Sequence, residues 1–229
     1  MVTTVENLDR WCFAWFEASQ AQGLNRAGLW LASRWIPGSV ITISFMEGDP
    51  ALLARIEAVA RQWIRPGRAS LLFDFRTDTN DTDIRISFSH EGSWSVLGTT
   101  ARRIPKSEPT MNFGWLKPDS SDAELERVVL HEFGHALGLV HEHQLPAGGI
   151  QWDKAAVCAD LRHKWPCEKV QRNVFDTIDA AEAAMTSLDP ASIMMYPIKK
   201  SWTTNGFSTT LNAQLSPTDI AFIRNMYSL

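Results

Sequence analysis

One stretch near the middle of the chain, HEFGHALGLVHEH (131–143), constrains the possible folds more than any other. His131 and His135 are four residues apart, so on a helix they lie about 40° from each other and face one point. Gly138 can adopt the positive φ that ends a helix and turns the chain. That turn brings His141 back toward the first two histidines. The spacing therefore predicts a helix that ends in a site for one metal ion.

The chemistry of this predicted site follows from the number of its ligands. Three imidazoles leave the fourth position of a tetrahedral zinc ion open to water, which distinguishes catalytic zinc sites from structural ones. Glu132 follows the first ligand, where its carboxylate can accept a proton from that water. We therefore expect one catalytic zinc ion on His131, His135 and His141, with Glu132 as general base. His143 is expected near the ligands or at the surface.

Composition excludes several other classes of protein. The 229 residues suffice for one sizeable core, and a net charge of −4 without a basic stripe gives no case for a nucleic-acid partner. No uncharged apolar run approaches the roughly 18 residues of a membrane span. The opening MVTTVENLDR lacks the basic and apolar regions of a signal peptide.

The periodicity of apolar residues predicts an α+β fold. Ser121 and Glu124 have the spacing of a capping box, and Asp49 with Pro50 marks the start of an earlier helix. Leu8, Trp11, Trp15 and Phe16 follow helical spacing, so the segment 1–33 is predicted to be helical. Strands are expected at 40–45, 69–75, 83–89, 94–98 and 109–115, and helices at 50–63, 121–137, 152–165, 175–187 and after Ser216.

The three cysteines leave two interpretations open. Cys158 and Cys167 bracket a short segment and either pair in an oxidising compartment or remain two buried thiols. Cys12 is then left alone.

The histidine motif H-E-x-x-H-x-x-G-x-x-H resembles that of the metzincin zinc metallopeptidases. Within them the chain resembles the astacin-like branch, because Glu142 follows the third histidine and SIMMY (192–196) resembles the astacin S-I-M-x-Y Met-turn. Met195, Tyr196 and Pro197 also fit the M-Y-P ending of matrixins. The separation of 53 positions from His141 to Met194 favours the astacin register (194 − 141 = 53).

The resemblance implies a metallopeptidase catalytic domain over 34–229. Its fold would be a mixed five-stranded sheet with two long helices above an active-site cleft, and a mostly helical or irregular lower lobe. Protein or peptide substrates would bind in extended form along the edge strand. Met194 would lie under the ligands, and Tyr196 would be a second catalytic residue that reaches the metal or the oxyanion. The resemblance also implies a secreted monomer.

Two questions stay open at this stage. A zinc-binding interaction module without catalysis, or a zinc amidase acting on non-peptide amides, would use the same ligands. The segment 1–33 is either a prosegment in the cleft, with Cys12 or Asp9 on the zinc, or an extension behind the upper lobe. The absence of a switch motif around Cys12 favours the extension.

Overall fold

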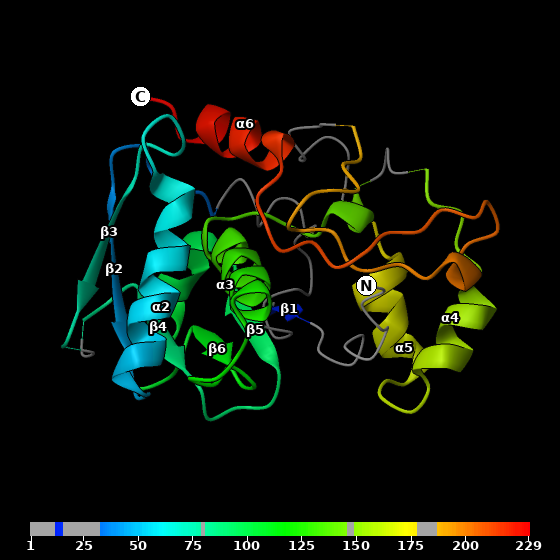
Figure 1. Cartoon of the computed structure of the whole chain (residues 1–229), viewed down its shortest axis with the longest axis horizontal. Coiled ribbons are helices and arrows are strands. Elements are labelled where there is room, and N and C mark those ends of the chain that lie inside the picture. The colour runs from blue at the N-terminus through cyan, green and yellow to red at the C-terminus, as the bar shows by residue number, and fades with distance from the viewer. Residues whose placement is uncertain (1–11, 16–32, 79–80, 146–148, 178–186) are drawn as a thin grey trace.

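A mixed sheet of six strands, in the order β1-β5-β6-β4-β2-β3, forms one lobe of the molecule. This arrangement is seen in a computed structural model that describes residues 12–15, 33–78, 81–145, 149–177 and 187–229 (Figure 1). Five strands come from the region predicted to contain them: β2 (Val40–Phe45), β3 (Leu72–Arg76), β4 (Ile84–Ser87), β5 (Ser93–Val96) and β6 (Met111–Phe113). β2, β3, β4 and β6 run parallel, whereas β5 pairs antiparallel with β6. The predicted five strands and mixed sheet are confirmed.

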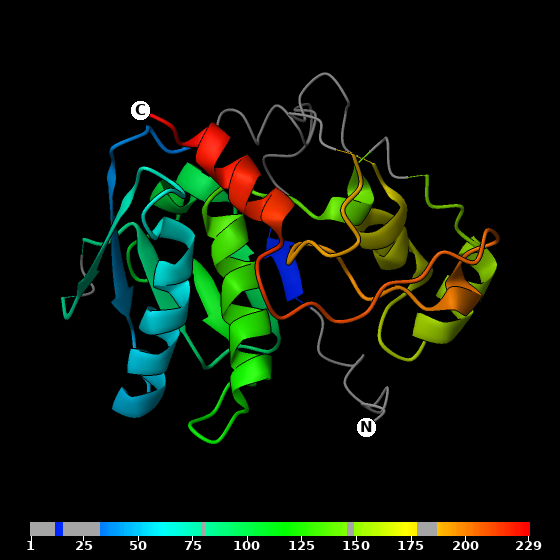
Figure 2. The ribbon, with the colours of Figure 1, turned by 45° about the horizontal axis from the view of Figure 1, so that its top comes forward.

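Two helices, α2 (Pro50–Ala60) and α3 (Asp122–Ala136), lie side by side over one face of this sheet (Figures 1 and 2). Asp49 caps α2 as predicted, since its carboxylate accepts hydrogen bonds from the amides of Ala51 and Leu52. A 3₁₀ turn, η1 (Arg61–Ile64), continues α2 and buries Trp63.

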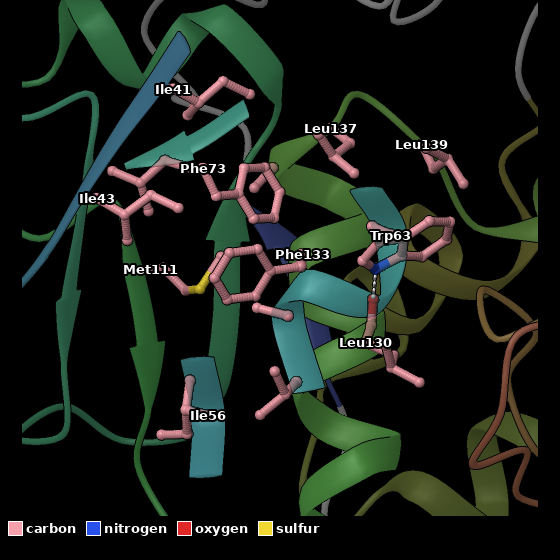
Figure 3. Packing of buried hydrophobic residues seen from close by; sticks show 14 of the residues in the cluster. Ile41, Ile43, Ile56, Trp63, Phe73, Met111, Leu130, Phe133, Leu137 and Leu139 are labelled. Atoms are coloured by element: carbon pink, nitrogen blue, oxygen red, sulfur yellow. Dashed lines mark hydrogen bonds between the residues drawn. The ribbon is translucent and has the colours of Figure 1, made fainter. Parts of the chain in front are cut away.

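The main core lies between the sheet and these helices. Ile41, Ile43 and Phe73 point from β2 and β3 toward Phe133 of α3 (Figure 3). The rings of Phe73 and Phe133 are 5.6 Å apart. Each large side chain that is fully buried here contributes about 1.5–3 kcal/mol relative to exposure. The core therefore fixes α3 firmly against the sheet.

A smaller lobe lies on the other side of α3 from α2 (Figures 1 and 2). It has its own apolar cluster, which includes Val157, Val170 and Trp202. A disulfide joins Cys158 and Cys167, whose Cα atoms are 5.3 Å apart, so the two cysteines are paired and not separate thiols. The lobe contains α4 (Lys154–Leu161), α5 (Cys167–Val170), the π-turn η5 (Gln171–Phe175) and the 3₁₀ turn η6 (Lys200–Trp202).

Three shorter elements complete the described chain: η2 (Gly98–Arg103), η3 (Glu142–Gln144) and the last helix α6 (Pro217–Met226). Ser216 and Asp219 form a complete capping box at the start of α6, which confirms the predicted last helix. None of the helices in the described part of the chain is long and apolar enough to cross a membrane.

Two predicted elements after Pro37 differ most from the structure. The second helical stretch was expected at 175–187, but α5 and η5 end at Phe175, residues 176–177 are not helical, and 178–186 lie outside the described residues. The segment 69–75 was expected to be a strand, but β3 begins only at Leu72. Ser70 instead donates its amide to the carbonyl of Tyr227, at the end of α6.

The sixth strand, β1 (Cys12–Trp15), lies within the segment 1–33 that was predicted to be helical. It pairs parallel with β5, in the register Cys12↔Ser93 to Trp15↔Val96, and lies against α3. Both views place it on the side of α3 that faces the smaller lobe (Figures 1 and 2). The predicted helix is therefore wrong at 12–15. The rest of the segment predicted to be helical, which includes Asp9, falls outside the described part of the chain, except for Ser33.

Candidate metal centre

The helix α3 begins and ends as its sequence requires. Ser121 is the N-cap and accepts a hydrogen bond from the amide of Glu124. Only this half of the predicted capping box forms, because the Glu124 carboxylate binds the indole of Trp115 and the guanidinium of Arg127 instead. At the other end Gly138 has a φ of 93°, and the amide of Leu139 donates to the carbonyl of Gly134. This Schellman-type ending confirms the predicted turn after the helix.

Three buried aromatic side chains bind backbone carbonyls of α3 and of the turn after it. Trp63 donates its indole N–H to Leu130 at 3.0 Å (Figure 3) and Trp35 donates to Ala136 at 2.8 Å. The hydroxyl of Tyr227 donates to Leu137 at 2.6 Å. Two of these acceptors, at Ala136 and Leu137, lie where a helix leaves its carbonyls without internal partners. These bonds hold the turn that directs the chain toward His141.

The imidazoles of His131, His135 and His141 converge as the motif predicts. The Nε2 atom of His141 lies 3.3 Å from that of His131 and 3.1 Å from that of His135. Ligand nitrogens at about 2.05 Å from a tetrahedral zinc ion would be about 3.3 Å apart. All three rings are buried, and they form the metal-ligand group found among the described residues.

Each ligand ring is oriented by an acceptor at its other nitrogen. Nδ1 of His131 lies 2.8 Å from the carbonyl of Ile193, and Nδ1 of His135 lies 2.8 Å from that of Leu139. A carbonyl oxygen can only accept, so both Nδ1 atoms carry the hydrogen, and the Nε2 lone pairs face inward. Nδ1 of His141 faces the amide oxygen of Gln144 at 3.3 Å. Facing lone pairs repel one another unless a cation lies between them, so the donor set fits a metal ion.

Burial also keeps these rings neutral. It lowers the pKa of His135 to about 4, against a hydrogen bond to Leu139 that raises it. Burial and the neighbouring histidines lower the pKa of His131 and His141 well below the usual value. Neutral imidazoles have the lone pair that metal binding requires.

The two predicted catalytic residues lie next to these ligands. Glu132 is fully buried on α3, directly after His131. The ring of Tyr196 is buried with its centroid 4.2 Å from that of His141 and 6.3 Å from that of His131. The structure therefore brings all five predicted site residues into one region.

The turn at 192–196 is held from two directions. The carboxylate of Asp219, at the start of α6, accepts from the amide of Ile193 at 2.8 Å. The carbonyl of this same Ile193 faces His131. The amide of Glu142 donates to the carbonyl of Met194 at 3.1 Å. Together these bonds join the third-ligand segment, this turn and the last helix.

Several residues around the site were not predicted from the sequence. Gln144 is buried and faces His141, although a glutamine after a histidine motif carries no spacing signal. His143 was expected near the ligands or at the surface. It is buried, and its ring is stacked 4.5 Å from that of Tyr196. Its Nε2 lies 3.0 Å from the carbonyl of Asn173 in the smaller lobe, a partner thirty residues later in the chain.

Comparison with known proteins yields matches only among solved structures. No protein-family model matches the sequence, and no curated protein matches it. One structure, described as "Structure of myroilysin", has 40% sequence identity and a TM-score of 0.82 over 86% of this chain and 97% of that one. Another, described as "Crystal structure of myroilysin", has 37% identity and a TM-score of 0.69 over 95% of this chain and 90% of that one.

The similarity to these two structures covers 86% and 95% of this chain. The fold and the buried three-histidine site are those of a metallopeptidase. Within that class, the chain belongs to the myroilysin family.

Proposed function

We propose that the protein is a zinc-dependent endopeptidase of the astacin-like branch of the metzincins. The observation that carries the proposal is the convergence of three Nε2 atoms at 3.1–3.3 Å, with Glu132 buried directly after the first ligand. Three neutral imidazoles with an open fourth position are the donor set of a catalytic zinc ion.

When bound, zinc supplies a Lewis acid that polarises the scissile carbonyl and lowers the pKa of water to about 7. Glu132 then acts as the general base, taking a proton from the attacking water and delivering it to the leaving amine. The oxygen of the water bonds to the carbonyl carbon, the C–N bond breaks, and the proton taken from the water goes to the nitrogen of the leaving amine. No side chain of the protein becomes covalently attached to the substrate.

The register of the turn at 192–196 supports the astacin-like assignment. Met194 packs against α3 so closely that a Cβ at Gly134 would lie 2.4 Å from its sulfur. Met195, the residue that the matrixin register would use, belongs instead to the apolar cluster of the smaller lobe. With Met194 in that position, Tyr196 is the residue whose phenol donates to the developing oxyanion.

Substrate binding and cellular location complete the proposal. An extended peptide would add to the sheet along β5 of the catalytic domain 34–229, in the position that β1 occupies in this structure, since backbone hydrogen bonds there accept many sequences. Secretion is supported by the Cys158–Cys167 disulfide, because such bonds persist in oxidising compartments. We also propose that the enzyme acts as a monomer.

The test is proteolysis by the zinc-loaded protein and by its Glu132→Gln variant. We expect digestion of casein that a chelator abolishes and zinc restores. Glu132→Gln should bind zinc normally and lose at least about a hundredfold in turnover, the scale of general-base catalysis. Zinc binding without hydrolysis of any amide would indicate an interaction module, and hydrolysis of small amides without proteolysis would indicate an amidase. Full proteolysis by zinc-loaded Glu132→Gln would contradict the mechanism.

A further inference from the structure

Gln144 is a buried amide that connects the third metal ligand to the smaller lobe. Its side-chain oxygen lies 3.3 Å from Nδ1 of His141. Its amide nitrogen lies 3.4 Å from the carbonyl of Arg172, within η5, and 3.2 Å from that of Asp176, directly after η5. The residue is 6% exposed, so water has little access to these groups.

The chemistry of its neighbours allows one orientation of this amide. The carbonyls of Arg172 and Asp176 can only accept hydrogen bonds, so the NH₂ group must face them. The opposite orientation would place the amide oxygen against two carbonyl oxygens in a buried site. The oxygen of Gln144 therefore faces His141, where it too can only accept.

This orientation determines the tautomer of His141. With an acceptor at Nδ1, the ring carries its hydrogen there, and Nε2 keeps the lone pair that points toward His131 and His135. The tautomers of His131 and His135 are determined in the same way, by the backbone carbonyls of Ile193 and Leu139. Among the described residues, Gln144 is the side chain that has this role.

We propose that Gln144 is a positioning residue, which holds His141 in the metal-binding tautomer and couples this ligand to the η5 segment of the smaller lobe. The inference rests on the proposed metal site but not on peptide hydrolysis. Acceptors behind histidine ligands typically change metal affinity 10–100-fold when they are removed. Gln144 thus makes the affinity of the site depend on the packing of the smaller lobe.

Two substitutions separate the acceptor from the rest of the side chain. Gln144→Met keeps a similar length but removes the acceptor. Gln144→Glu keeps an oxygen toward His141 but places the other oxygen against the carbonyls of Arg172 and Asp176. The matched control is Gln171→Met, because Gln171 also donates its amide within this segment, to the Asp176 carboxylate at 2.8 Å, without contacting a ligand.

The readouts are the zinc dissociation constant, from competition with a chromophoric chelator, and the His141 tautomer in the metal-free protein, from nitrogen-15 chemical shifts. We expect Gln144→Met to bind zinc about 10–100-fold more weakly, with a mixed His141 tautomer. Gln171→Met should keep the Nδ1–H tautomer and zinc affinity close to that of the unsubstituted protein. Gln144→Glu should keep the tautomer and lose less affinity than Gln144→Met, because it loses the contacts with η5 but keeps the acceptor toward His141. Thermal unfolding of each metal-free variant shows whether it is folded.

Unchanged affinity and tautomer in folded Gln144→Met would overturn the inference. A loss of zinc affinity in folded Gln144→Glu equal to that in Gln144→Met would also overturn it, because the missing acceptor would then not explain the loss. Neither readout involves proteolysis, so a protein that binds zinc through Gln144 but cleaves no peptide would contradict only the proposed peptidase function.

Discussion

At the scale of single residues, the chain offers its own control for the proposed role of Tyr196. It contains two tyrosines, and both are buried. Tyr227 donates its hydroxyl to the carbonyl of Leu137 and lies 3.4 Å from the amide of Trp35, so that hydroxyl has a structural role. Tyr196 packs its ring against His141 and His143. Removing each hydroxyl should therefore have different consequences.

We predict that Tyr196→Phe lowers the catalytic rate on the order of a hundredfold, the usual effect of removing one oxyanion donor. Zinc content should change little, because the ring contacts with His141 and His143 remain. Tyr227→Phe should do the reverse, since an unpaired buried carbonyl costs about 1–3 kcal/mol of stability while turnover per folded molecule is kept. Steady-state kinetics and urea unfolding of both variants check this. A normal rate in Tyr196→Phe would favour the matrixin register.

Some residues of the site could be predicted from the sequence and others could not. The three ligands, Glu132 and Gly138 lie within eleven residues, so helix geometry and one turn are enough to bring them together. Trp35 and Tyr227 lie 101 and 90 residues from the carbonyls that they bind. No local pattern encodes such a contact, because it depends on how the whole lobe packs.

At the scale of secondary structure, the difference at Cys12–Trp15 has a clear physical reason. A short run of apolar residues fits a helix or a buried strand equally well, and the spacing of Trp11, Trp15 and Phe16 favoured the helix. The antiparallel β5 leaves one row of backbone groups unpaired, and β1 supplies their partners. Tertiary pairing therefore overrides the local periodicity. The strand 40–45 was predicted with its observed bounds because its apolar residues alternate in the sequence itself, and the predicted strand 83–89 contains the shorter β4.

This pairing leads to a prediction about access to the site. If substrates add to the β5 edge, β1 occupies that position and should slow proteolysis. The backbone N–H groups of successive strand residues point to opposite sides. Of Phe13 and Ala14, only one therefore donates to β5, and proline at that position removes this hydrogen bond. We expect one of Phe13→Pro and Ala14→Pro to raise the initial rate on a peptide substrate, as should a chain that begins at Arg34.

The comparison between the two proline variants is the internal control, because both introduce the same residue into the same strand. Zinc content should be equal in all of these proteins. Equal initial rates in the full chain, both variants and the chain from Arg34 would show that β1 does not compete with substrates. The segment would then be a permanent part of the sheet.

At the scale of the whole molecule, the metal site joins the two lobes. His131 and His135 belong to α3 of the sheet lobe. His141 follows the turn and is linked through Gln144 to η5 of the smaller lobe. The sequence predicted two lobes around a zinc site, but the order of helices in the smaller lobe was not predictable. Its elements are short and include a π-turn, and a disulfide joins two of them, so the sequence carries little helical periodicity from which to predict them.

Because the ligands join α3 to a segment that contacts the smaller lobe through Gln144, removal of zinc should destabilise the whole fold. Zinc at 100 times its dissociation constant stabilises a protein that binds it only when folded by about 2.7 kcal/mol. For a chain of this size that corresponds to a shift of roughly 5–10 °C in the unfolding temperature. Scanning calorimetry with zinc and with chelator measures this shift. His163→Ala, which removes an exposed imidazole of the smaller lobe, should show the same shift as the unsubstituted protein. His141→Ala should show almost none, because two imidazoles hold zinc weakly. A full shift in His141→Ala would mean that zinc binds elsewhere.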